Sequence, residues 1–183
     1  MAEIMNQLED QQLYQEFKKS KNIKIIKINK VFFEEACVDG DLEAIIYILS
    51  ENKNINPEIN MFKALLFSCC LGHLNVVKYL LENSTKICEE KIDIHLYNEN
   101  LFTEACRNCH LDVVKYLWEY SKYKIDVHVD EDQPIKHAYM MQNTTILNYL
   151  LCIGVYNSGI MNMIINNTGV SFDISGFAVI KKS

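Results

Sequence analysis

The chain has 183 residues, of which 49% are hydrophobic and 23% are charged, and its formal net charge is −6. This composition suits a soluble protein with a hydrophobic core, and the acidic balance gives no general attraction to nucleic acid or to anionic membranes. No apolar run reaches the roughly 18 residues that a membrane helix needs, and the polar, acidic residues 1–10 do not resemble a secretory signal. Seven cysteines without such a signal indicate free thiols in a reducing compartment.

Residues 1–22 predict an N-terminal capping helix, because apolar residues recur there at roughly helical spacing among polar ones. A lysine-rich segment follows, and it carries a spaced apolar pair. The same kind of pair precedes each later helical segment, so we interpret it as an extended finger whose apolar side chains pack on the next unit. The pairs are Ile23 and Ile25, Ile55 and Pro57, Ile92 and Ile94, and Ile125 and Val127.

One stretch of sequence, from Gly72 to Leu81, recurs clearly from Cys109 to Trp118 and more faintly at two further places. With the small residues Ala36, Ser68, Ala105 and Ala138 aligned, the copies lie 32, 37 and 33 residues apart. A period of about 33 residues is typical of helical repeat arrays. We predict a repeat region over 23–156 with helical hairpins at about 31–51, 61–83, 100–120 and 134–152, followed by a cap and tail over 157–183.

Each hairpin has a recognisable pattern. Small residues in the first helix predict close packing between helix axes. The turn residues predict a positive φ. Cys109 lacks the freedom of glycine, so it should be strained or should loosen its turn. The second helices predict one buried stripe each, and four extra residues within Thr85–Lys91 predict a mobile surface loop. The turn residues are Gly40, Gly72, Cys109 and Asn143; the stripes are Leu74, Val77 and Leu81, and Leu111, Val114 and Trp118.

The stretch Gly72-His73-Leu74-Asn75-Val76-Val77-Lys78-Tyr79-Leu80-Leu81, between Ser68-Cys69 and Ile92-Asp93-Ile94-His95, resembles an ankyrin repeat. Its richness in Asn, Ile and Lys is similar to that of ankyrin repeat proteins encoded by giant DNA viruses of amoebae. The resemblance covers roughly residues 22–152 and implies an all-α, ankyrin-like helical repeat solenoid of about four helix-turn-helix units with capping helices. The usual Thr-Pro-Leu-His opening survives only as Pro134 and the apolar Phe33, Leu66, Phe102 and Ile135.

The resemblance implies a protein–protein interaction module that binds through its finger tips and the concave face of its first helices. Acidic tips favour a basic partner surface, although a merely solvated acidic face is an equal alternative. The candidate contact residues are Tyr97, Asn98, Glu99, Thr103, Arg107, Asp130, Glu131, Asp132, Lys136 and His137. We expect no cofactor, no nucleic-acid or membrane partner, a monomer, and a cytoplasmic location, in the host cell if the protein is viral. A scaffold or virion component without a dedicated partner remains an alternative.

A second class of function, haem or metal binding, is suggested by Cys106-Arg107-Asn108-Cys109-His110, which matches the Cys-x-x-Cys-His pattern of haem attachment. The repeat register favours a core role for Cys106 and a turn role for Cys109. It likewise gives His95 and His128 structural roles, satisfied by a backbone group or a carboxylate. No Gly-rich phosphate loop, nucleophile elbow or His-Glu-x-x-His motif occurs, so we do not expect an enzyme.

Overall fold

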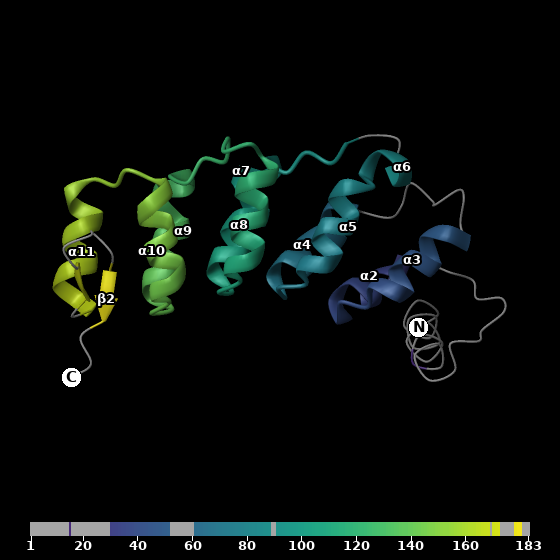
Figure 1. The fold of residues 1–183 in the computed structure, drawn as a ribbon, viewed down its shortest axis with the longest axis horizontal. Coiled ribbons are helices and arrows are strands. Elements are labelled where there is room, and N and C mark those ends of the chain that lie inside the picture. The colour runs from purple at the N-terminus through teal and green to yellow at the C-terminus, as the bar shows by residue number, and fades with distance from the viewer. Residues whose placement is uncertain are drawn as a thin grey trace, which may run out of the picture. The chain divides into compact units, whose positions relative to one another are not determined.

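Figure 1 shows the computed structural model of the chain, which is built from short helical hairpins. It describes residue 15 and residues 30–51, 61–88, 91–168, 170–172 and 178–180. The chain divides into two compact units, Met1–Ile92 and Asp93–Ser183. Apart from residue 15, the predicted N-terminal cap lies outside the described residues, as do the finger positions 23, 25, 55 and 57. Within the described residues, no helix combines the length and the apolar character needed to cross a membrane.

The described part of the first unit contains two hairpins and a short additional helix. Helices α2 (Lys30–Asp39) and α3 (Leu42–Glu51) form the first hairpin, and α4 (Met61–Cys70) and α5 (Leu74–Glu82) form the second. The two first helices, α2 and α4, pack against each other. The extra residues of the long repeat form α6 (Ser84–Cys88) directly after α5, so the predicted loop was wrong over this part. Ser84 is buried, and its hydroxyl donates to the carbonyl of Leu81 at 3.0 Å.

The second unit repeats the arrangement and closes it with a different element. Helices α7 (Leu96–Arg107) and α8 (Leu111–Tyr120) form one hairpin, and α9 (Val129–Met140) and α10 (Thr144–Ile153) form the next, with α7 against α9. Helix α11 (Ser158–Thr168) precedes strands β1 (Val170–Phe172) and β2 (Ala178–Ile180), which pair antiparallel with Val170 opposite Ile180. Strand β1 lies against α11 and β2 against α10. The described chain is otherwise helical, which confirms the all-α, ankyrin-like fold class and adds one small strand pair that we did not predict.

Small residues lie where the first helices pack. Ala36, Ser68, Ala105 and Ala138 are fully buried, as predicted. Ser68 keeps its hydroxyl satisfied by donating to the carbonyl of Ala64 at 2.9 Å, which avoids the cost of an unpaired buried polar group. The large apolar residue three positions earlier is also fully buried, and in the second hairpin this residue is Leu65. The expected match at Leu66 was therefore one residue late, since Leu66 is only half-buried.

The second helices bury a different stripe from the one expected. In α8 the buried residues are Val113, Val114 and Leu117, and in α5 they are Val76, Val77, Leu80 and Leu81. Leu74, Leu111 and Trp118, which the stripe also included, are half-buried. Leu74 and Leu111 are the first residues of their helices, so their side chains lie at the turn end of the hairpin. The core face therefore begins two residues further along.

All four turns between paired helices have one geometry. In each turn one residue with a positive φ, the first or second after the first helix, donates its N–H to the carbonyl three residues back, and the next residue donates to the carbonyl five residues back. This is the Schellman pattern, which satisfies the last carbonyls of a helix. Cys109 occupies the turn with φ 67° and both hydrogen bonds are kept, so the turn is not loosened. In the last hairpin Gln142 takes this place with φ 53°. The expectation for Asn143 was wrong, because Asn143 instead caps α10 by accepting from the N–H of Ile146 at 3.0 Å.

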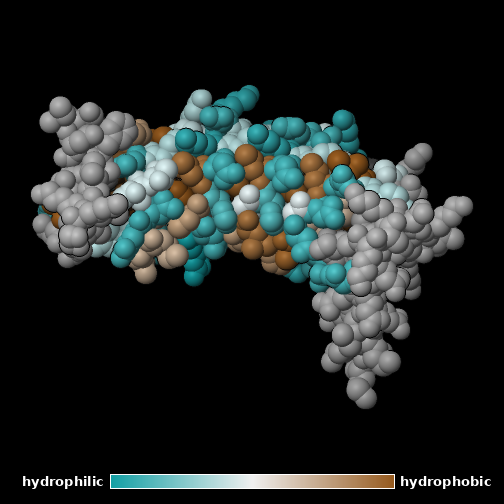
Figure 2. Space-filling view, turned by 60° about the horizontal axis from the view of Figure 1, so that its bottom comes forward, coloured by the Kyte–Doolittle hydropathy of each residue, from teal (hydrophilic) through white to brown (hydrophobic). Residues whose placement is uncertain are grey.

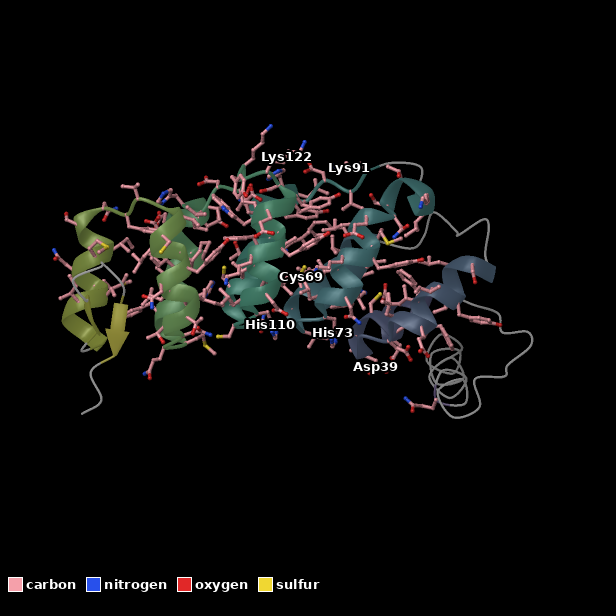
Figure 3. The ribbon with its side chains drawn as sticks, in the orientation of Figure 1. Asp39, Cys69, His73, Lys91, His110 and Lys122 are labelled. Atoms are coloured by element: carbon pink, nitrogen blue, oxygen red, sulfur yellow. The ribbon has the colours of Figure 1, made fainter. Side chains whose placement is uncertain are left out.

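Side chains also link the two hairpins of the first unit. The Nε2 of His73 lies 2.8 Å from the carbonyl oxygen of Val38, which joins the two turns. Figure 3 shows His73 and Asp39 at the turn end of these helices, with Lys91 at the opposite end. The ammonium group of Lys63 lies 2.9 Å from a carboxylate oxygen of Glu34 and 5.2 Å from the centre of the Phe67 ring. These contacts fix the register between neighbouring repeats.

Candidate partner-binding surface

The fingertips of the second unit are two left-handed turns, one at the start of α7 and one at the start of α9. Tyr97, Asn98 and Glu99 have φ of 53°, 55° and 55°, and the equivalent residues 33 positions later, Asp130, Glu131 and Asp132, have φ of 49°, 59° and 66°. Each such residue costs on the order of 1 kcal/mol in a chain of L-residues. Three in succession therefore need strong local support.

A repeated set of hydrogen bonds supports these turns. The Nδ1 atom of His95 lies 2.7 Å from the Oε1 atom of Glu99, and the Nδ1 atom of His128 lies 2.6 Å from the Oδ1 atom of Asp132. Just before each histidine, an aspartate side chain accepts from the histidine N–H at 2.9 Å: Asp93 in the first fingertip and Asp126 in the second. A carboxylate only accepts, so each ring donates from Nδ1. These contacts confirm the predicted structural roles of His95 and His128.

Two further bonds connect the fingertips to each other. The Oε1 atom of Glu99 also accepts from the backbone N–H of Asp126 at 3.3 Å, across 27 residues of sequence. The Nδ2 amide of Asn98 donates to the Oδ1 atom of Asp130 at 3.2 Å. Consecutive fingers of the second unit therefore lie in direct contact.

The two fingertips present an aromatic ring and two carboxylates to solvent. The exposed fraction of Tyr97 is 73%, and the side chain of Glu131 is 94% exposed. Asn98 and Asp130 are also exposed. The same unit carries the exposed cations Lys122 and Lys124, and Figure 3 places Lys122 at the finger end of α8, opposite His110. The surface is thus acidic at the tips with basic groups on the adjoining loop.

The first helices contribute a second group of candidate residues. Arg107 is exposed and lies 3.4 Å from a carboxylate oxygen of Glu104. Lys136 is half-buried, and its ammonium group lies 4.0 Å from Glu131. Burial, and then the neighbouring Arg107 guanidinium, hold the pKa of His137 below its ordinary value, while Glu104 acts in the opposite direction. Arg107, His137 and Glu104 therefore form one electrostatic group on adjacent first helices.

Some of the candidate residues are not placed to meet a partner. Glu99 is 7% exposed, and the side chain of Asp132 is 15% exposed; both hold their histidines, so we correct their assignment from contact residues to fingertip supports. Thr103 is half-buried, and its hydroxyl oxygen is covered without a hydrogen-bond partner among the described residues. The other candidate residues keep accessible surface: Tyr97, Asn98, Arg107, Asp130, Glu131, Lys136 and His137.

Sequence patterns gave no signal for the apolar groups exposed near the turns. Met140 and Met141 are 71% and 59% exposed in the second unit, and Val38 and Leu71 are 40% and 45% exposed in the first. Figure 2 brings this side forward and shows brown apolar patches interrupted by teal hydrophilic residues. The positions of these four residues hold other residue types in the other repeats. The repeat pattern depends on the buried positions, so it does not predict these exposed apolar groups.

The residues of the haem-like motif do not fit a cofactor or metal site. Cys106 is fully buried on the core side of α7, and burial raises the pKa of its thiol well above the ordinary value. A haem linkage or a metal needs an accessible thiol or a thiolate. Cys109 occupies the turn at φ 67°, and His110 is the N-cap residue immediately before α8. Within the described residues, no three His, Cys, Asp or Glu side chains are arranged to hold a metal ion.

A known protein family matches part of the second unit. Residues 97–129, which run from the fingertip of α7 to the start of α9, match the family model of the ankyrin repeat. The hairpin of α7 and α8 thus matches an ankyrin repeat, and the other described hairpins share its helix-turn-helix form. Ankyrin repeats are generally protein–protein interaction modules, and proteins of this family are generally not catalytic.

Proteins similar to the chain occur in a giant virus, Acanthamoeba polyphaga mimivirus. The chain is 31% identical over 100 residues to the ankyrin repeat protein L66, and 29% identical over 129 residues to the ankyrin repeat protein R837. These matches cover 55% and 70% of this chain but only 15% and 17% of L66 and R837. The chain therefore spans a small part of the length of these relatives, and the resemblance to giant-virus ankyrin proteins is confirmed at the level of the repeats.

Proposed function

We propose that the chain binds another protein through the fingertips of its second unit and the adjoining first-helix face, and that it performs no catalysis. The observation that carries the proposal is the display of Tyr97, Asn98, Asp130 and Glu131 on left-handed turns held by side-chain hydrogen bonds, of which those to Glu99 are partly buried. Rigid turns lose little conformational freedom when a partner binds, which favours affinity. Strained backbone that is supported in this way is common at binding sites.

The exposed groups favour a partner that carries lysine or arginine. A cation can contact the face of Tyr97 and the carboxylates of Asp130 or Glu131. Because these groups lie on the surface, their charges would chiefly speed the encounter and select the partner. The nearby Lys122 and Lys124 would in turn disfavour a uniformly basic surface, so a short segment with spaced cations suits the site better.

A selection from a library of short peptides, performed on the full chain, tests this proposal. We expect enrichment of peptides that contain lysine or arginine, with binding weakened by added salt. The paired changes Asp130→Lys and Glu131→Lys should abolish that binding while leaving Asp132 to hold its finger. The matched control is Asp112→Lys with Glu119→Lys, which makes the same change of net charge on exposed positions of α8.

The outcomes separate the alternatives. Equal binding by both charge-reversed variants would remove the fingertips from the site. Loss of binding only with Lys136→Ala or His137→Ala would move the site to the first-helix face. No enrichment of any peptide would favour a scaffold or virion component without a dedicated partner.

A further inference from the structure

We infer that the two fingertips of the second unit act as one rigid surface, and that Glu99 is the positioning residue that joins them. The rigidity of the two turns is independent of any partner. Only its consequence for partner binding rests on the proposed function.

The first support is a continuous path of hydrogen bonds between the two fingertips. It runs from the ring of His95 to the carboxylate of Glu99, and from that carboxylate to the backbone N–H of Asp126. It continues from the side chain of Asp126 to the N–H of His128, and from the ring of His128 to Asp132. Each distance lies between 2.6 and 3.3 Å. Glu99 is the residue at which this path passes from one repeat to the next.

The second support is the burial of Glu99. Only 9% of its side chain is exposed, and a hydrogen bond to a charged group away from water is stronger than one at the surface. The other link between the fingertips, from Asn98 to Asp130, is exposed and competes with water. Loss of Glu99 should therefore release both turns, whereas loss of Asn98 should change little.

The equivalent residue in the next repeat provides a natural control. Asp132 holds His128 as Glu99 holds His95, but this bond stays within its own fingertip. If each carboxylate only supported its own turn, changing either would loosen one fingertip. If Glu99 joins the fingertips, its removal loosens two and the removal of Asp132 loosens one.

Backbone hydrogen exchange on the full chain distinguishes these cases without any partner. The reporters are the N–H groups of Asp126, which binds Glu99, and Asp132, which donates to the carbonyl of His128 at 3.1 Å. In Glu99→Ala we expect both to exchange about tenfold faster or more, the size expected for a lost bond to a buried charged group. In Asp132→Ala and Asn98→Ala the N–H of Asp126 should change by less than about twofold. The N–H of Val114, in the core of α8, should exchange as in the unchanged protein in every variant.

The inference is overturned if Glu99→Ala leaves the N–H of Asp132 unchanged, or if Asp132→Ala accelerates exchange at Asp126 equally. If Glu99→Ala does not fold, Glu99→Gln replaces it, because the amide oxygen can still accept but carries no charge. This variant should give a smaller acceleration at both reporters, and an effect at the N–H of Asp126 without one at the N–H of Asp132 would again overturn the inference. Since these readouts involve no ligand, a failed peptide selection leaves the result standing.

Discussion

The ring of His73 lies directly over Gly40, the residue that follows the first helix of the preceding hairpin. A Cβ atom added to Gly40 would stand 2.7 Å from the Cγ atom of that ring. Gly40 also has φ of 68°, which glycine adopts without strain. One position therefore meets two requirements, a left-handed turn and room for the histidine that reaches the carbonyl of Val38.

Gly40→Ala should destabilise the protein by about 1–3 kcal/mol, because it adds backbone strain and a steric clash. In a His73→Ala background the clash disappears, so the same change should cost only about 1 kcal/mol. Denaturant unfolding of the four proteins in this cycle measures the difference. Equal costs in both backgrounds would show that the ring does not press on this position.

Leu117→Ala should lower the free energy of unfolding by about 2–5 kcal/mol, because it empties space in the core of α8. Leu111→Ala should cost clearly less, since Leu111 is half-buried. Arg107→Ala, on the surface, should stay within about 0.5 kcal/mol. Urea unfolding compares the three. A cost for Leu111→Ala as large as that for Leu117→Ala would contradict the observed core face.

Stability should depend on pH through His137. Its pKa in the folded protein lies below the ordinary 6.5, so the unfolded chain binds this proton more tightly. The free energy of unfolding should therefore fall as the pH drops through that value, and His137→Gln should make the dependence shallower. In an NMR titration, Arg107→Gln should raise the midpoint of His137 and Glu104→Gln should lower it. The same direction of change in both variants would contradict the proposed group.

Thiol reactivity should follow burial. Burial raises the pKa of Cys37 to about 12, with a smaller opposing contribution from a hydrogen bond with Ser68, and it raises the pKa of Cys69 and Cys106 as well. Because the thiolate is the reactive form, these three should resist alkylation until the protein unfolds, while the exposed Cys152 reacts first. Mass spectrometry of labelled peptides, with and without urea, reads this order. Early labelling of Cys106 would reopen the haem or metal alternative.

Most of the hairpin architecture could be predicted from the sequence, because close helix packing restricts residue size at particular positions. Ala36, Ser68, Ala105 and Ala138 show this restriction plainly, and aligning them gives the period. The wrong predictions concern positions where helix packing restricts residue size less. Leu111 recurs between repeats as regularly as Val113, yet it lies at the start of its helix. Periodicity alone therefore did not distinguish the half-buried Leu111 from the buried Val113.

The fingertips could be located but not described from the sequence. Glu99 looks like a surface residue, since its charge gives no hint that it turns inward to His95 and the backbone of Asp126. The spacing Asp-x-His-x-x-x-Glu/Asp, present at residues 93–99 and 126–132, was the available signal. Its meaning depends on three left-handed residues in succession, which no propensity for helix or strand anticipates.

The left-handed fingertips also limit the residue types that can form new recognition surfaces. Valine, isoleucine and threonine are crowded at φ near 55°, and proline cannot reach it. When such a repeat is duplicated and diverges, substitutions at residues 97–99 and 130–132 are confined to residues that tolerate this backbone, with asparagine, aspartate and glycine the most readily accepted. New specificity must then arise from a few residue types at these positions, or from exposed neighbours such as Lys124 that are outside these two turns.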